Sequence, residues 1–128
     1  PILGICVGMQ LMVDFSLEHG HHPGLQWIQG EVRKIVPQDP KCRIPHVGWN
    51  DVYFQQSFGG FSAGDSANFY FDHSFAIFNA QEENILAKAD HGETFAAALI
   101  SDNIVAAQFH PEKSQEAGIK FLNAFLSF

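Results

Sequence analysis

Basic residues are scarce in this chain of 128 residues. Lys and Arg together number 7 against 14 Asp and Glu, so the formal net charge is −7 with neutral histidines. Such an acidic surface repels phosphate backbones, which argues against a nucleic-acid partner. Long apolar runs are also missing, since no stretch approaches the roughly 18 uncharged apolar residues that a membrane-spanning helix needs. The sequence therefore predicts binding to neither nucleic acid nor membrane.

Cysteine is scarce as well. Cys6 and Cys42 are the only two, and two cysteines do not form the disulfide framework of a secreted domain. A reducing, cytoplasmic location fits best. Hydrophobic residues make up 46% of the chain and charged residues 16%, a globular composition at a length that suits one domain.

An initiator methionine is absent too. The chain starts at Pro1, directly before an apolar run, and no basic segment precedes that run as it would in a signal peptide. We interpret the chain either as a processed product or as the back part of a longer protein.

Apolar runs and turn residues predict the elements. Strands are expected at 2–6, 31–36, 46–54, 68–73, 95–101 and 104–109, helices at 9–15 and 114–126, and loops at 17–30 and 55–67. Asp102-Asn103 would join the last two strands as a hairpin. Strands outnumber helices, yet each end of the chain pairs a strand with a helix. This pattern favours an α/β domain with some antiparallel pairing.

A cysteine stands at the first predicted strand-to-helix turn. Gly4 and Gly8 flank Cys6 in the pattern of a nucleophile elbow, with cysteine in place of serine. The glycines allow close passage of the backbone, and the N-terminus of the following helix favours the thiolate and offers N–H groups to an oxyanion. The alternative is a buried structural cysteine at the end of a strand.

A histidine with a nearby carboxylate is the natural partner of such a thiol. In Phe109-His110-Pro111-Glu112, proline opposes a helix and keeps His110 extended. Residues i and i+2 of an extended segment project to the same side, so Glu112 can orient the imidazole. Alone, this segment reads more simply as a strand end with a solvated acid; together with the cysteine it suggests a Cys-His-Glu triad.

The segments 4–10 and 108–114 resemble the two signatures of class I (triad) glutamine amidotransferases. Two more segments, 45–50 and 69–75, resemble the glutaminase subunits of imidazole glycerol phosphate synthases. The resemblance implies an α/β fold whose mixed, mainly parallel sheet is flanked by helices. It also implies that residues 1–128 are the C-terminal part of the domain, starting at the nucleophile strand. The missing N-terminal part would carry the first strands and a glycine-containing loop of the oxyanion hole, so the isolated chain is expected to be inactive or weakly active.

The family resemblance assigns a role to each matching residue. Cys6 would be the nucleophile that attacks glutamine, His110 the base and Glu112 the residue that orients it. The Val7 amide would serve the oxyanion. Substrate-binding positions are Gln10, His73, Ser74 and Phe75. Positions near the partner are His46, Trp49, Asn50 and Lys113.

The same resemblance implies a partner but no cofactor and no metal. Ammonia would pass to a (β/α)8-barrel cyclase that makes imidazole glycerol phosphate in histidine biosynthesis. His19, His21 and His22 could suggest a metal, but no acid or thiol pattern accompanies them, and they are expected in a loop. Three alternatives remain: a related amidotransferase for sugar amidination in surface-polysaccharide synthesis, an inactive binding remnant, and an unrelated thiol hydrolase.

Overall fold

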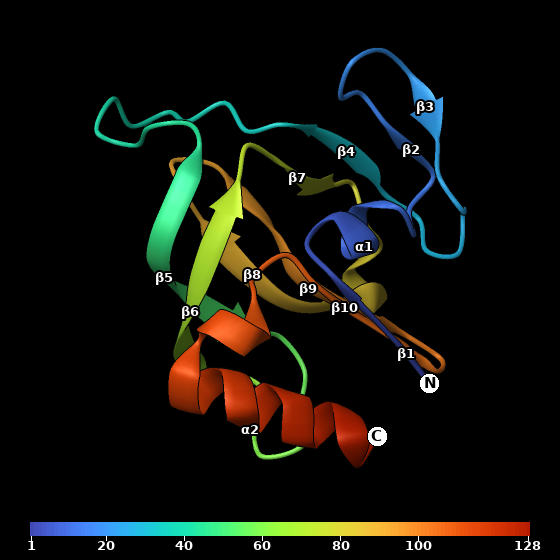
Figure 1. The fold of residues 1–128 in the computed structure, drawn as a ribbon, viewed down its shortest axis with the longest axis vertical. Helices are drawn as coiled ribbons and strands as arrows, with labels where there is room; N and C mark the ends of the chain where they lie inside the picture. Colours follow the sequence, from blue (N-terminus) through green and yellow to red (C-terminus); the bar gives the residue numbers. More distant parts are fainter.

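A computed structural model describes all 128 residues as one mixed sheet with few helices (Figure 1). The strands are β1 (Ile2–Ile5), β2 (Phe15–Ser16), β3 (His22–Pro23), β4 (Glu31–Lys34), β5 (His46–Phe54), β6 (Ser66–His73), β7 (Phe75–Phe78), β8 (Ile85–Asp90), β9 (Thr94–Ser101) and β10 (Ile104–Ala107). The helices are α1 (Val7–Gln10) and α2 (Gln115–Leu126), with 3-10 turns η1 (Glu82–Asn84) and η2 (Pro111–Lys113). No helix is long and apolar enough to cross a membrane.

The sheet runs in the order β3-β2-β4-β7-β9-β8-β5-β6, and β10 joins β9 to β1. The expected α/β fold with a mixed sheet is confirmed, but the expectation of mainly parallel pairing is wrong for this chain. Only β1 with β10 and β2 with β4 are parallel. Parallel neighbours need crossovers of a dozen or more residues, whereas residues 91–93 alone join β8 to β9 and residues 102–103 alone join β9 to β10, so these neighbours are antiparallel. Of the expected flanking helices only α2 is present at full length, because α1 has only four residues.

The predicted helix over 9–15 is wrong. After α1 the chain turns, and backbone N–H groups of a crossing loop take the next carbonyls: Leu25 N donates to Leu11 O at 2.8 Å and Trp27 N to Met12 O at 2.9 Å. These carbonyls are therefore not available to N–H groups further along a helix. The expected loop 17–30 contains the short strand β3, and β7 and β8 lie where no strand was predicted. The other predicted strands, the hairpin and the closing helix are confirmed to within a few residues.

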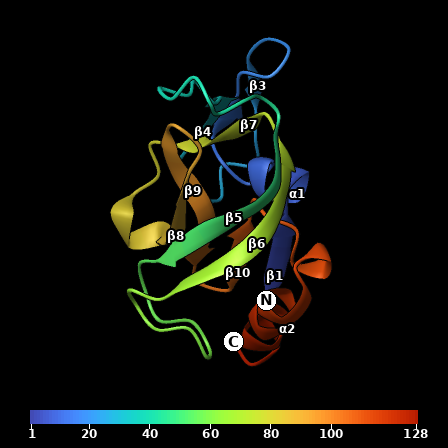
Figure 2. The same ribbon diagram turned by 90° about the vertical axis from the view of Figure 1, so that its left-hand side faces the viewer.

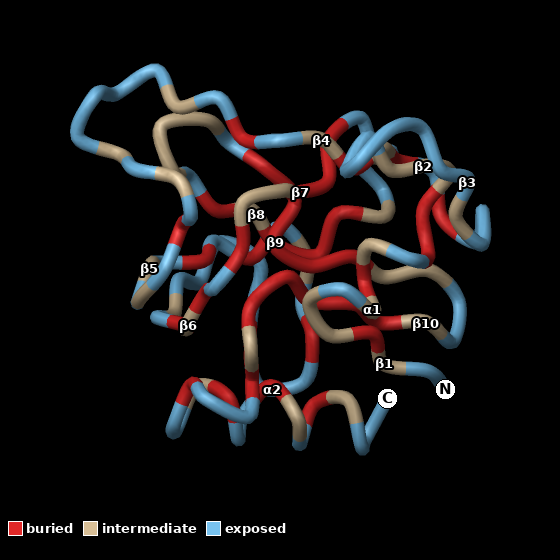
Figure 3. Tube along the Cα trace, turned by 45° about the horizontal axis from the view of Figure 1, so that its top comes forward, coloured by how far each residue is buried: buried red, intermediate tan, exposed pale blue.

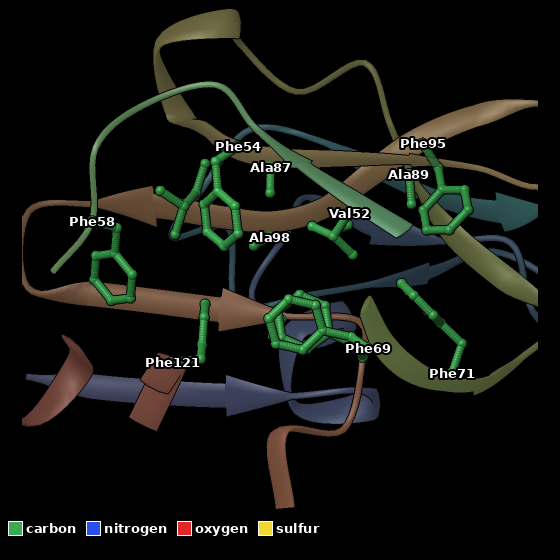
Figure 4. Packing of buried hydrophobic residues seen from close by; sticks show 14 of the residues in the cluster. Val52, Phe54, Phe58, Phe69, Phe71, Ala87, Ala89, Phe95, Ala98 and Phe121 are labelled. Atoms are coloured by element: carbon green, nitrogen blue, oxygen red, sulfur yellow. The ribbon is translucent and has the colours of Figure 1, made fainter. Parts of the chain in front are cut away.

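Aromatic packing fixes the segment that leads into His110. Phe109 is fully buried, and its ring stacks on Phe69 of β6 with centroids 4.0 Å apart. Phe121 of α2 meets both rings edge-on. Figure 4 shows Phe69 and Phe121 within this cluster, and Figure 3 shows that α2 is buried only along its inner side. Burying an aromatic side chain contributes about 2 kcal/mol or more, so this cluster anchors the chain next to the predicted base.

Close contact between α2 and η2 yields a first prediction. A Cβ atom added at Gly118 would lie 1.9 Å from the carbonyl oxygen of Pro111. Gly118→Ala is therefore expected to destabilise the protein by about 3 kcal/mol, because backbone must move away from backbone. Urea denaturation measures the change. Gly8→Ala is the control, since an added Cβ meets nothing within 4 Å there; equal midpoints for the two variants would contradict the prediction.

Candidate active site

Parallel pairing of two strands brings the predicted nucleophile and base to one edge of the sheet. In the register of β1 and β10, Ile5 lies beside Ala107. Cys6 therefore follows β1 at the same edge where the chain leaves β10 toward His110. The Cys6 amide continues the ladder and donates to Ala107 O at 2.8 Å. The fold thus brings the ends of β1 and β10 side by side (Figure 1), although Cys6 and His110, which follow these two strands, are 104 positions apart in the sequence.

Cys6 occupies a strained turn. Its φ of 54° and ψ of −109° lie in a region that residues with a side chain rarely adopt, and such strain is typical of functional sites. Gly4 is needed for this turn, because an added Cβ would lie 2.7 Å from Met12 Cε and 3.0 Å from the backbone of Gly8. The elbow prediction is supported by this geometry. At Gly8 itself a Cβ would meet open space.

The thiol is not a ready thiolate in this structure, contrary to the expectation from the elbow. Burial raises the pKa of Cys6, and the carboxylates of Asp72 and Glu112 add to the rise. The Val7 amide and the Gln108 side chain oppose it by hydrogen bonding to the sulfur. Burial has the largest of these effects, so the net direction of the pKa shift is upward. A base must therefore remove the proton before Cys6 can act as a nucleophile.

His110 and Glu112 lie in contact. His110 Nδ1 is 2.8 Å from Glu112 Oε2, as predicted from their spacing. His110 is extended, but Pro111 begins the turn η2 instead of continuing a strand. Proline suits the first position of a helical turn, because its missing N–H would have no partner there. The carboxylate fixes Nδ1, which leaves Nε2 free to act on a thiol, although no hydrogen bond joins His110 to Cys6 in the structure.

The backbone of His110 is clamped to β6. Its N–H donates to Tyr70 O at 2.9 Å, and its carbonyl accepts from Ser114 Oγ at 2.6 Å. The same Ser114 hydroxyl accepts from Tyr70 N at 3.0 Å. Ser114 is 1% exposed, so this closed ring of bonds is shielded from water. Sequence reasoning assigned no role to Ser114 or Gln108, although both stand inside the segment 108–114 that carries the second family signature.

Two of the predicted substrate-binding residues, Gln10 and His73, meet at the backbone carbonyl of a third, Phe75. Gln10 Nε2 donates to Phe75 O at 3.0 Å and to Gln108 Oε1 at 2.9 Å. His73 Nδ1 also meets Phe75 O, at 2.8 Å, and Ser74 O accepts from Ile35 N. The structure thus brings Gln10, His73 and Phe75 together. Asp72 is exposed, and its carbonyl lies 4.0 Å from the Cys6 sulfur.

The four residues expected near a partner divide into two groups. Trp49 and Lys113 are exposed and both flank Tyr70: the Trp49 and Tyr70 rings lie 6.1 Å apart, and Lys113 Nζ lies 5.8 Å from the Tyr70 ring. Asn50 follows Trp49 in β5 and is partly exposed, but its side chain points to the opposite face, where Nδ2 bonds to His46 Nε2 and Asp90 O. His46 is 4% exposed and bonded to His73, so its side chain offers no surface to a partner. Figure 2 shows β5 and β6 side by side at the front of the molecule.

No group of three or more His, Cys, Asp or Glu side chains is arranged so that it could hold a metal ion. His19, His21 and His22 are exposed; His19 and His21 lie outside the strands, while His22 begins β3. Among the described histidines only His46 and His73 are buried.

The buried histidines predict a pH-dependent stability. Burial, followed by the nearby His73 and His91, lowers the pKa of His46 to about 3; burial and His91, opposed by the Phe75 carbonyl, lower the pKa of His73 to about 4. Both are neutral in the fold but titrate near 6.5 when unfolded. Below pH 6.5 the unfolded chain binds more protons, so stability is complete above that pH and is lost as the pH falls toward 4.

Unfolding in urea at pH 6.5 and pH 5 measures this effect. The free energy of unfolding is expected to fall by about 2–4 kcal/mol between these values. His46→Phe should reduce the dependence on pH, whereas His21→Gln, at an exposed site, should leave it unchanged. The same dependence in His46→Phe as in the unaltered protein would contradict the assignment.

A family comparison accounts for this arrangement of residues. The family of class I glutamine amidotransferases matches residues 1–127. The chain belongs to the class I glutamine amidotransferases. Its relatives include the imidazole glycerol phosphate synthase subunit HisH of Caulobacter vibrioides and that of Zymomonas mobilis. Each is 46% identical over 129 residues and matches all of this chain.

This amidotransferase chain spans only 61% and 59% of the length of those two relatives. Solved structures share its fold. A protein of Thermoplasma acidophilum described as a GMP synthase component superposes with a TM-score of 0.67 at 25% identity, over 99% of this chain and 56% of that one. Another glutamine amidotransferase gives a TM-score of 0.67 at 17% identity, which supports the fold alone.

Proposed function

We propose that the protein hydrolyses glutamine to glutamate and ammonia, and that the ammonia serves a cyclase making imidazole glycerol phosphate in histidine biosynthesis. The observation that carries the proposal is the placement of the strained Cys6 elbow beside the strand that leads to the His110–Glu112 pair. The names of the relatives select the pathway, since both are imidazole glycerol phosphate synthase subunits.

The chemistry follows from the groups present. His110 Nε2 removes the thiol proton, and the Cys6 sulfur attacks the side-chain amide carbon of glutamine. The Val7 amide, already directed at Cys6, donates to the developing oxyanion. The carbon–nitrogen bond then breaks, and His110 returns its proton to the leaving ammonia. Water hydrolyses the resulting glutamyl thioester, which releases glutamate and restores the thiol.

Glutamine itself is held next to the elbow. The amide nitrogen of Gln10 is used by Phe75 O and Gln108 Oε1, so its Oε1 remains as an acceptor for the substrate's ammonium group. The backbone from His73 to Phe75 forms the adjacent wall. The proposed substrate-binding set is therefore Gln10, His73, Ser74 and Phe75.

We propose further that residues 1–128 are the C-terminal part of a longer domain. The chain's coverage of 61% of the Caulobacter relative supports this, and so do the exposed apolar side chains of Val7 and Leu11 beside the nucleophile, at 63% and 57%. The remaining part would supply the second oxyanion donor. Below, "the completed chain" means residues 1–128 joined to the remaining segments of that relative.

The proposed partner, a barrel-shaped cyclase, would contact the surface around Tyr70 formed by Trp49 and Lys113. Asn50 is left out of this surface, because its side chain is bonded to His46 and to Asp90 O on the other face of β5. An exposed Trp beside a cation suits an interface anchor. His46 is left out of this surface because it is buried. Two unpaired cysteines agree with the proposed cytoplasmic location.

Glutamate release from glutamine by the completed chain tests the proposal, with and without a histidine-pathway cyclase. Release that the cyclase stimulates is the expected result. Stimulation by a sugar-modifying enzyme alone would select the polysaccharide alternative. No release from a folded sample in any mixture would contradict glutaminase function and favour the binding remnant.

A further inference from the structure

A continuous line of hydrogen-bonded side chains leads from the surface of β5 to the sulfur of Cys6. It begins at Asn50, passes through His46 and His73 to the carbonyl of Phe75, and continues through Gln10 and Gln108. We propose that His46 and Gln108 are positioning residues of the glutaminase site: His46 holds Gln10 through His73 and Phe75, and Gln108 holds the Cys6 sulfur. This inference rests on the proposed role of Cys6 as the nucleophile.

The carbonyl of Phe75 fixes the direction of each hydrogen bond between Asn50, His46 and His73, which form the histidine half of the network. Phe75 O can only accept, so His73 Nδ1 carries the hydrogen of their 2.8 Å contact. A neutral His73 then presents the lone pair of Nε2, which must accept from His46 Nδ1 at 2.8 Å. His46 Nε2 in turn accepts from Asn50 Nδ2 at 3.2 Å. The remaining Asn50 hydrogen goes to Asp90 O at 2.8 Å, so each ring nitrogen has one partner and one role.

The same carbonyl fixes the glutamine half. Gln10 must direct its Nε2 toward Phe75 O, because that oxygen cannot donate. The second hydrogen of Gln10 Nε2 then meets Gln108 Oε1 at 2.9 Å. This bond turns the Gln108 amide so that its Nε2 faces the Cys6 sulfur at 3.6 Å. Phe75 O therefore couples His73 and Gln10 as a shared acceptor.

Burial makes this arrangement costly to break. Gln108 is 0% exposed, His46 4% and His73 7%, and the chain contains no buried side-chain polar atom without a partner. Breaking one link would leave a buried donor or acceptor unpaired, away from water. The rings are also held by packing, since His46 stacks on Phe71 at 4.6 Å and on His91 at 4.1 Å. The network thus has a single well-defined state.

Each half of the network predicts a different kinetic effect. Loss of the His46 bonds would release His73 and loosen Gln10, the proposed contact of the bound glutamine. The KM for glutamine should therefore rise while kcat changes little. Loss of the Gln108 amide removes a donor from the sulfur, which disfavours the thiolate. The reaction of Cys6 with any electrophile should then slow, whether or not glutamine is the substrate.

The His46 half is tested with paired variants of the completed chain. His46→Phe keeps the ring stacking but removes both hydrogen bonds, and we expect about a 5- to 20-fold rise in KM with kcat within about 3-fold. His46→Gln restores one donor and one acceptor and should recover at least half of the loss on a logarithmic scale. Phe95→Leu is the control, because Phe95 packs on both rings without joining the network. It should lower Tm but leave KM unchanged.

The Gln108 half is tested by alkylating Cys6 with iodoacetamide across pH, followed by peptide mass spectrometry. Gln108→Met keeps the side-chain length but lacks the amide, and alkylation at pH 7.5 should be about 3- to 10-fold slower, with the pH profile moved upward. Alkylation of Cys6 can be measured without glutaminase activity. It tests Gln108 even if the variants at position 46 do not fold.

The outcomes separate the two proposals. Slower alkylation of Gln108→Met in a completed chain that releases no glutamate would support the positioning role while the proposed function fails. Glutamate release with an unchanged alkylation profile in Gln108→Met would overturn the Gln108 assignment. A KM in folded His46→Phe equal to that of the unaltered protein, or equal to that of Phe95→Leu, would overturn the His46 assignment.

Discussion

Replacing Cys6 by alanine is expected to lower kcat for glutamine hydrolysis in the completed chain by about 10⁴-fold or more. Loss of the nucleophile removes the covalent path, and in hydrolases that use a triad the remaining groups recover only a small part of the rate. The change removes a half-buried sulfur at a turn, so the fold should persist. Glutamate release at saturating glutamine measures the effect, with circular dichroism as a check of folding.

Cys42 provides the matched control. It is the second free cysteine and lies in the loop before β5, where its amide donates to Asp39 O. Cys42→Ser should leave the rate unchanged. A large loss in Cys42→Ser, or sustained glutamate release by Cys6→Ala, would contradict the assignment of the nucleophile.

Glu112→Gln is expected to lower kcat by about 10²- to 10³-fold with little change in KM. The carboxylate receives a hydrogen from His110 Nδ1 and stabilises the imidazolium that forms when Nε2 takes the thiol proton. A neutral amide can present its NH₂ group to Nδ1 instead, which selects the wrong tautomer. The Glu112 side chain is 50% exposed, so the loss should be smaller than for a buried acid. Steady-state kinetics on the completed chain measure both constants.

Glu116 tests whether any acid near η2 has the same effect. It lies in the first turn of α2 and is exposed, and Glu116→Gln makes the identical chemical change. Its rate should equal that of the unaltered protein. If the two variants lose activity equally, the orienting role of Glu112 is wrong and the effect is one of general charge.

The site was predictable where local spacing carries the chemistry. The two glycines around Cys6 predicted the turn, and the separation of His110 and Glu112 by one residue predicted their contact. Both features depend on few neighbouring residues. Tertiary packing adds the exact backbone conformation, namely the strained φ of Cys6 and the 3-10 turn at Pro111.

Contacts between residues distant in the sequence determine the elements that the sequence patterns did not predict. The carbonyls of Leu11 and Met12 pair with residues about 14 positions later, so an apolar segment that looked helical turns instead. Apolar and polar residues do not alternate clearly in β8, so the sequence pattern did not predict a strand there. Most residues of β8 are buried on both faces of the sheet beside β9. His46 looked like a surface residue because its partner His73 is 27 positions away.

Covalent labelling of the completed chain tests the account most directly. A glutamine analogue with an electrophilic carbon in place of the side-chain amide should attach to Cys6 alone, as peptide mass spectrometry would show. Excess glutamine should protect Cys6, and His110→Asn should slow the labelling, because Nε2 then no longer accepts the thiol proton. Labelling at Cys42, or a completed chain that releases glutamate while Cys6 stays unlabelled, would contradict the account.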